Sequence, residues 1–145
     1  MFRTFDRWTT SWLLSCVAFA THILDESMRG SFGFYSDMER MMTNVMPSMH
    51  MAPFNFDVWL VNMTGTLVVL FLLTPLVRLR NPLMIPASFV FAAFLTGNAA
   101  LHLVMAVSQQ RLVTGSETAP LMLVAGLFLF LSTARRLVET REKGV

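Results

Sequence analysis

Two histidines stand inside otherwise apolar stretches of this chain, and each has polar neighbours at helical spacing. His22 begins the segment His22-Ile23-Leu24-Asp25-Glu26, and His102 ends the segment Asn98-Ala99-Ala100-Leu101-His102. Residues three or four positions apart share a helix face, so Asp25 and Glu26 align with His22. Asn98 aligns with His102 in the same way. An ionisable residue in a membrane helix is costly and usually faces a partner, a cavity or a ligand, which makes these segments the candidate site.

The residue types fit a metal site or a general acid–base site. His22 and His102 with Glu26 offer two nitrogens and one oxygen, enough to hold zinc, iron or manganese with an open position. Asp25 and Asn98 are further candidate ligands, and Asn98 is also suited to orienting a histidine. A metal would activate water or polarise a substrate carbonyl. Without a metal, the histidines and Glu26 would act as general acid and base, so these three are also the candidate catalytic residues.

Two other interpretations of the histidines stay open. His22 and His102, on separate helices at similar depth, would also suit the two axial positions of a haem, and His102 alone would suit a chlorophyll-type pigment. The acidic neighbours of His22 argue against a haem because porphyrin faces need apolar walls. Alternatively, these polar residues only hydrogen-bond between helices and fix their packing.

Composition indicates an integral membrane protein. The 145 residues are 54% hydrophobic and 14% charged, whereas soluble proteins carry about 25% charged residues. Four apolar segments approach the ~20 residues that cross a bilayer. They predict an all-α, single-domain four-helix bundle over residues 1–145, with spans at about 9–26, 58–77, 84–107 and 120–137. Cys16 is the only cysteine, which excludes an internal disulfide.

Charge predicts the orientation of the four spans. Eight basic residues would lie on the side that holds both termini and only three on the other, so both termini are predicted to be cytoplasmic, in a bacterial inner membrane. The eight are Arg3, Arg7, Arg78, Arg80, Arg135, Arg136, Arg141 and Lys143, and the three are Arg29, Arg40 and Arg111. The candidate site then faces outward. These basic residues form no continuous patch, so nucleic-acid binding is not expected.

The N-terminal segment has an alternative interpretation as a cleaved signal peptide. Arg3 and Arg7, a short apolar run and Ala18-Phe19-Ala20 resemble its parts. The apolar pattern continues past Ala20, however, which favours a membrane helix. Trp8 and Trp12, with Trp59 on the other side, are predicted to anchor the helices at the two membrane interfaces.

The extracytoplasmic connection over 28–56 is too long for a simple turn. Ser36-Asp37-Met38-Glu39 resembles a capping box, and methionines follow it at helical spacing, which predicts an amphipathic helix on the membrane surface. Flexible methionines suit contact with lipid, substrate or another membrane subunit. Met46, Met49, His50 and Met51 also suggest a Cu(I) site, but a methionine stripe is more often apolar packing.

The two histidine segments resemble those of the HXXEE-motif membrane proteins. His22-Ile23-Leu24-Asp25-Glu26 is similar to their signature, and Asn98-Ala99-Ala100-Leu101-His102 to their second histidine region. Asp25 stands where the first glutamate is expected, and Thr114-Gly115-Ser116-Glu117 stands in place of a Tyr-x-Pro-Gly element. The resemblance implies a small multi-span membrane protein and supplies candidate residues, but no reaction.

Three functional hypotheses follow, and they leave open whether the protein is an enzyme. In the first, an outward-facing His/carboxylate site carries out metal-dependent or acid–base chemistry on a lipid-like substrate. In the second, the chain is a non-catalytic accessory subunit of a larger membrane complex. In the third, the histidines ligate a haem or a chlorophyll-type pigment.

Overall fold

The described part of the chain is built from four long helices. The computed structural model describes residues 6–29, 35, 40, 43–44 and 55–142. The long helices are α1 (Arg7–Arg29), α3 (Phe56–Arg78), α4 (Met84–Gln109) and α5 (Ala119–Glu142). Each predicted apolar segment lies inside one of them, and the prediction of an all-helical fold is confirmed for the part of the chain that the structure describes. Most of the predicted methionine-rich helix, including the candidate copper ligands Met46, Met49, His50 and Met51, lies outside the described residues.

The helix ends follow local sequence signals. Asp6 caps α1, because its Oδ1 accepts hydrogen bonds from the Thr9 amide and hydroxyl at 2.8 and 2.7 Å. Asn55 caps α3 by accepting a hydrogen bond from the Val58 amide at 3.1 Å. Helix α4 ends at Gln110, whose φ of 50° is left-handed.

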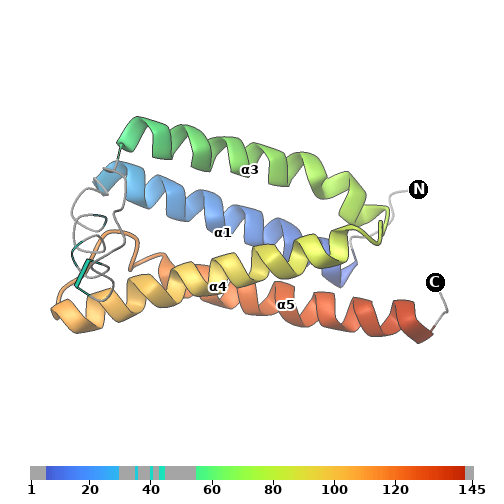
Figure 1. Cartoon of the computed structure of the whole chain (residues 1–145). Helices are drawn as coiled ribbons and strands as arrows, with labels where there is room; N and C mark the ends of the chain where they lie inside the picture. Colours follow the sequence, from blue (N-terminus) through green and yellow to red (C-terminus); the bar gives the residue numbers. More distant parts are fainter. Residues whose placement is uncertain (1–5, 30–34, 36–39, 41–42, 45–54, 143–145) are drawn as a thin grey trace.

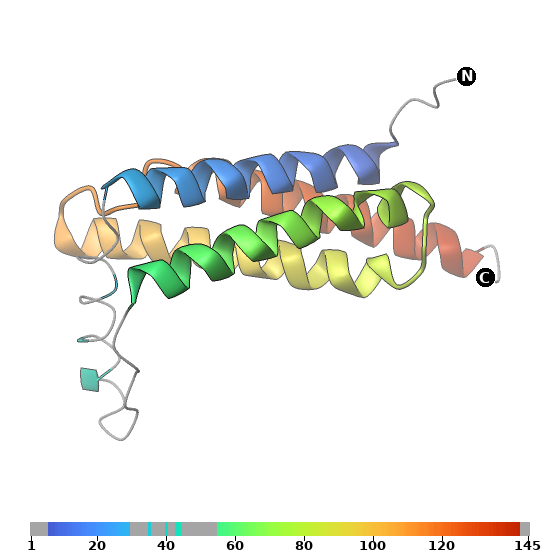
Figure 2. The same cartoon turned by 90° about the horizontal axis from the view of Figure 1, so that it is seen from above.

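The helices pack so that α5 contacts both α4 and α1, whereas α3 lies along α1 (Figure 1). Figure 2 shows that the first turn of α1 and the last turn of α5 lie on the same side of the bundle as the turn between α3 and α4. Small side chains bring α5 close to its neighbours. A Cβ on Gly126 would stand 2.8 Å from Thr96 Cγ2. The Ser11 and Ser132 hydroxyls hydrogen-bond at 2.5 Å between α1 and α5.

The tryptophans predicted to anchor the chain at the membrane interfaces belong to the core instead. Trp8 is 3% exposed and Trp12 is fully buried. Their indole N–H groups donate to Ser88 Oγ and to the Leu70 carbonyl, both at 3.2 Å. Trp59 is also buried. The anchoring prediction was wrong because these side chains pack inside the bundle, where the indoles of Trp8 and Trp12 also find hydrogen-bond partners and therefore do not need an interface.

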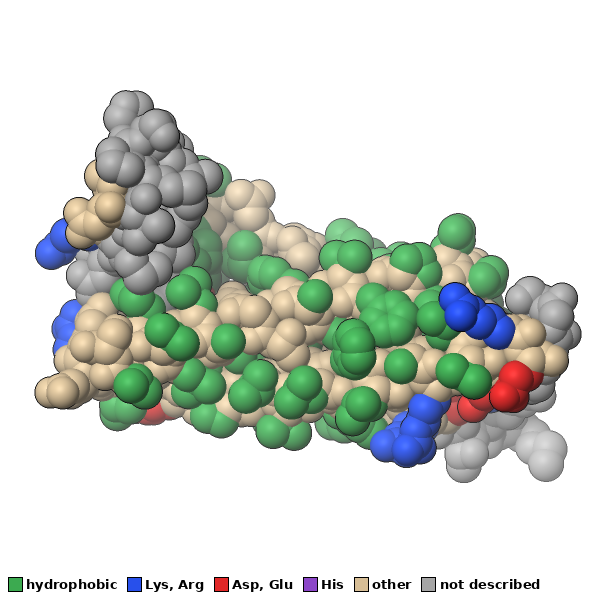
Figure 3. All heavy atoms as spheres, turned by 60° about the horizontal axis from the view of Figure 1, so that its bottom comes forward, with side chains coloured by type: hydrophobic (Ala, Val, Ile, Leu, Met, Phe, Trp, Pro, Cys, Tyr) green, Lys and Arg blue, Asp and Glu red, His purple; other side chains and the backbone are tan. Residues whose placement is uncertain are grey.

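Three of the described helices, α3, α4 and α5, are long and apolar enough to cross a membrane. Their outer faces carry exposed leucine, valine and phenylalanine side chains. In Figure 3, hydrophobic side chains cover the length of the visible face, and charged side chains lie towards its ends. Helix α1 is not among the three, because its hydroxyl-bearing and ionisable residues lower its hydropathy. Its span over 9–26 stays a prediction, and five of its polar residues are buried in the bundle: Thr9, Ser11, Ser15, His22 and Glu26.

Asp6 is expected to stabilise the fold, because it caps α1 and pairs with Arg80. Burial raises the pKa of Asp6, but the hydrogen bonds from Thr9 and the charge of Arg80 outweigh it and hold this pKa below its usual value. We expect Asp6→Ala to lower the free energy of unfolding by about 1 kcal/mol at neutral pH. A depressed carboxyl pKa stabilises above the unfolded-state value of about 4, and this contribution disappears as pH falls through the folded-state value. Thermal unfolding of detergent-solubilised protein should therefore show a variant deficit at pH 7 that shrinks as pH falls below about 4. A deficit independent of pH would contradict the assignment.

Candidate functional site

Three of the predicted site residues meet in the interior of the bundle. His22 and Glu26 lie one turn apart on α1, and His102 comes from α4. All three side chains are buried, with at most 4% of each exposed. The Glu26 carboxylate is near both rings: its Oε2 is 3.8 Å from His22 Nε2, and its Oε1 is 3.2 Å from His102 Nε2. The two imidazoles contact each other edge to face, with ring centres 4.8 Å apart.

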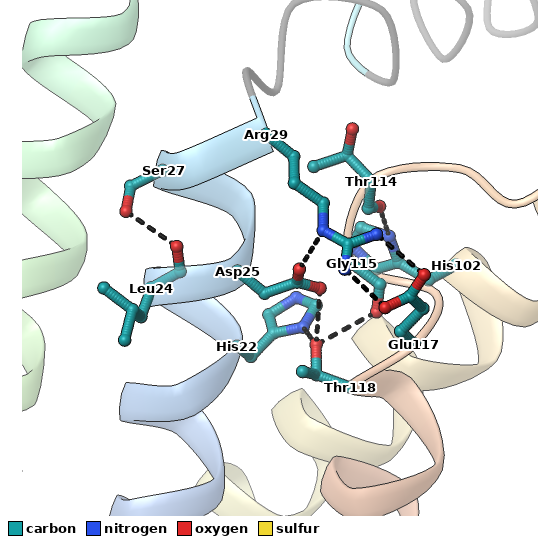
Figure 4. Close-up of polar contacts among 10 residues, drawn as sticks. All are labelled: His22, Leu24, Asp25, Ser27, Arg29, His102, Thr114, Gly115, Glu117 and Thr118. Carbon is teal, nitrogen blue, oxygen red and sulfur yellow. Dashed lines mark hydrogen bonds and ion pairs between the residues drawn. The ribbon is translucent and has the colours of Figure 1, made fainter.

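The backbone of the segment between α4 and α5 fixes the tautomer of His102. His102 Nδ1 lies 2.8 Å from the Thr114 carbonyl oxygen (Figure 4). A carbonyl can only accept, so Nδ1 carries the proton and donates it. In the neutral ring, Nε2 is then left with its lone pair, on the side where Glu26 lies. That is the tautomer a metal-binding histidine needs.

A threonine hydroxyl imposes the same tautomer on His22. Thr118 Oγ1 lies 2.8 Å from His22 Nδ1 and 3.2 Å from both Asp25 Oδ2 and the Gly115 carbonyl (Figure 4). Asp25 and the carbonyl are acceptors, so they compete for the single hydroxyl proton. Thr118 oxygen therefore accepts from His22 Nδ1–H. The Nε2 lone pair of His22 also faces the glutamate.

The centre of the site is consequently rich in acceptors. His22 Nε2 and Glu26 Oε1 are fully buried and have no hydrogen-bond partner among the described residues. A buried acceptor without a donor costs roughly 1–3 kcal/mol. Two imidazole lone pairs and a carboxylate turned towards one another need a positive species between them, either a proton or a metal cation.

The spacing of these acceptors suits a metal ion. One ligand atom from each of His22, Glu26 and His102 can be chosen so that all lie within 4.8 Å of one another. The ligands of a tetrahedral zinc, at about 2.0–2.1 Å from the metal, lie about 3.3 Å apart. The His102 nitrogen is 3.2 Å from one carboxylate oxygen and the His22 nitrogen 3.8 Å from the other, so the group would have to contract slightly around a bound ion.

Gly115 is the residue that lets the connecting segment close over both rings. Its φ is +83°, in the left-handed region. A Cβ here would lie 2.6 Å from His102 Cε1 and 2.7 Å from His22 Cε1. The segment that replaces the expected Tyr-x-Pro-Gly element therefore forms one wall of the site. Sequence reasoning missed Thr114, Gly115 and Thr118 as site residues, although a glycine next to polar residues just before a predicted span was a usable signal.

Asp25 lies outside the three-residue group and supports it from the side. Its Oδ1 pairs with Arg29 Nε at 2.8 Å, while its Oδ2 accepts from Thr118. Arg29 in turn binds both carboxylate oxygens of Glu117. The hydrogen bond from Arg29 holds the pKa of Glu117 below its usual value. This ion-pair network ties the end of α1 to the start of α5.

Two further residues border the site. Asn98, the fifth predicted residue, is half-buried one turn before His102 and lines a surface pocket with it. Tyr35 lines the same pocket, and burial together with the Glu26 charge raises the pKa of its hydroxyl. Nothing in the sequence pattern singled out Tyr35, because it belongs to the long connection between the first two spans.

Comparisons with protein-family models, with curated proteins and with solved structures find no match to this chain. The similarity to HXXEE-motif proteins therefore stays a resemblance between short motifs.

Proposed function

We propose that this chain is an integral membrane protein that binds one divalent metal ion, zinc, iron or manganese, through His22, Glu26 and His102. The observation that carries the proposal is the convergence of two buried imidazole nitrogens, both with lone pairs facing one carboxylate. Two buried acceptors of the group, His22 Nε2 and Glu26 Oε1, have no hydrogen-bond partner among the described residues, and a cation that joins them would stabilise them. Thr114 and Thr118 hold the rings in the required tautomers, as outer partners of metal-bound histidines do.

Such a site would support hydrolytic or carbonyl chemistry on a lipid-like substrate. Three protein ligands leave a position for water or substrate. A bound metal lowers the pKa of that water or polarises a carbonyl. The surroundings fit a substrate from the membrane, because α4, which supplies most of the wall of the pocket that His102 lines, also exposes apolar side chains such as Val90, Phe94 and Val104.

The geometry favours a bare metal ion over the other cofactors. His22 and His102 contact each other edge to face, which leaves no space between the rings for a porphyrin. A pigment held by His102 alone remains an outcome to be read from the absorption spectrum. A proton shared by the histidines and Glu26 would instead make the site a general acid–base site.

The test is elemental analysis and visible absorption of detergent-purified protein. We expect about one zinc, iron or manganese ion per chain, lost in both His22→Ala and His102→Ala. The third histidine of the chain, His50, provides a matched control, and His50→Ala should keep the metal. Protein that takes up none of the three metals, or that keeps its metal in either site variant, would overturn the proposal.

The other outcomes separate the competing functions. A Soret or chlorophyll-type band lost with a site histidine would identify a haem or pigment protein. Copper lost only in His50→Ala would indicate the methionine-rich site. A colourless, metal-free protein that copurifies in fixed ratio with larger subunits would favour the accessory-subunit hypothesis.

A further inference from the structure

Two hollows lie end to end along α4. The first has a volume of about 420 Å³ and is almost entirely apolar. Residues of α1, α3 and α4 line it, namely Phe19, Met63, Thr66, Leu70, Val90 and Phe91, with Ala87 and Phe94. It is open at the side of the bundle, because α3 packs along α1 and leaves part of α4 uncovered. A groove of this composition suits an alkyl chain.

The second hollow, of about 410 Å³, is more polar and reaches the candidate metal site. It is lined by Tyr35, Asn98 and His102 together with Ala93, Phe94, Gly97 and Leu101. His102 belongs both to this wall and to the buried three-residue group. The Asn98 amide and the Tyr35 phenol make its wall more polar than that of the first hollow, where Thr66 is the one polar residue among the described lining residues, and His102 places this wall next to the candidate metal site.

Phe94 joins the two hollows because it lines both. Its side chain is 41% exposed, and its ring rests edge to face against Phe19 with centres 5.4 Å apart. Gly97, one turn further along α4, leaves the passage open, since a Cβ there would meet no atom within 4 Å. The two hollows together form one crevice along α4. Its walls are apolar near Leu70 and become more polar towards His102.

We infer that this crevice binds a single-chain fatty-acyl molecule, with its alkyl chain between α3 and α4 and its carboxyl end at Asn98 and His102. The inference rests on the proposed function and names its substrate class. An acyl chain matches the apolar groove, and a carboxyl or ester group matches the polar end next to the metal ligands. The open side of the crevice lets such a molecule enter directly from the lipid layer.

The experiment uses palmitic acid carrying a photoreactive diazirine, with purified protein in nanodiscs and labelled residues mapped by mass spectrometry. A diazirine near the chain end should label groove residues such as Leu70 and Val90. One near the carboxyl group should label Phe94 and Leu101. Unlabelled palmitic acid should compete with both, and the labelling should saturate.

Gly97→Leu is the blocking variant, since its side chain would project into open space and leucine is a better helix former than glycine. It should raise the probe concentration for half-maximal labelling by about tenfold, with the metal content unchanged. Gly65→Leu is the matched control, because Gly65 also faces open space, on α3 and outside the crevice walls. Its labelling should equal that of the wild type.

The outcomes distinguish this inference from the metal proposal. Labelling that does not saturate, or that is the same in Gly97→Leu and wild type, would overturn fatty-acyl binding whatever the metal content. Saturable, Gly97-sensitive labelling of a protein that binds no metal would support the crevice and refute the metal site.

Discussion

Replacing Gly115 with alanine is expected to lower the free energy of unfolding by about 2–4 kcal/mol and to abolish metal binding. The left-handed φ of +83° accounts for about 1–2 kcal/mol of this cost. The remainder comes from overlap, because the new methyl group would stand within 2.7 Å of atoms in both histidine rings. Either the rings must turn or the segment that carries Gly115 must move away from them, and both changes disturb the arrangement of the two histidines. Thermal unfolding and elemental analysis of one preparation measure both effects.

Gly126→Ala is the matched control for this substitution. Its methyl group would also be crowded, at 2.8 Å from Thr96 Cγ2, but it lies between α4 and α5, away from the histidines. We expect this variant to lose stability and keep its metal. If Gly115→Ala retained the wild-type metal content, Gly115 would not be needed to position the two rings.

Replacing Thr118 with valine is expected to weaken metal binding by about 10–100-fold, the usual cost of losing a partner that orients a metal-bound histidine. Valine keeps the shape of threonine but removes the oxygen that accepts from His22 Nδ1. The ring would lose the bond that fixes its tautomer, and Asp25 would lose a donor. The dissociation constant for zinc, measured by competition with a chelator, reports the loss.

Two further variants make the Thr118 result specific. Thr118→Ser keeps the hydroxyl and should restore most of the affinity. Thr133→Val removes a hydroxyl from α5 that donates within its own helix to the Leu129 carbonyl, and should leave zinc binding unchanged. Equal affinities for Thr118→Val and wild type would show that the hydroxyl does not hold His22 in its metal-binding form.

The sequence indicated the pairing of His22 with Glu26 because an i, i+4 spacing fixes a common helix face whatever the tertiary structure. It also indicated that His102 lies at the same depth, since three antiparallel apolar segments of known length leave little freedom along the bundle axis. Depth follows from counting residues along a span, whereas the direction in which a helix face points does not.

The burial of the tryptophans is a second feature that the sequence alone could not predict. An aromatic residue near the end of an apolar segment is common at membrane interfaces, and the sequence pattern alone favours that interpretation for Trp8 and Trp12. Whether an indole faces lipid or another helix depends on which acceptor lies opposite. Here Ser88 and the Leu70 carbonyl are those acceptors, and both are far away along the chain.

The sequence by itself determined the four apolar segments, the helical class and the residues able to bind a cation, because periodicity and side-chain chemistry are local properties. Only the tertiary structure decided that Thr114, Gly115 and Thr118 wall the histidines and fix their tautomers, and that Asp25 turns to Arg29 instead of joining Glu26. Those outcomes depend on how α4 and α5 pack and how the segment between them closes. Each of the hydrogen bonds that fix the tautomers joins a side chain to an atom from another segment of the chain, and the spacing of residues along one helix cannot predict where that atom lies.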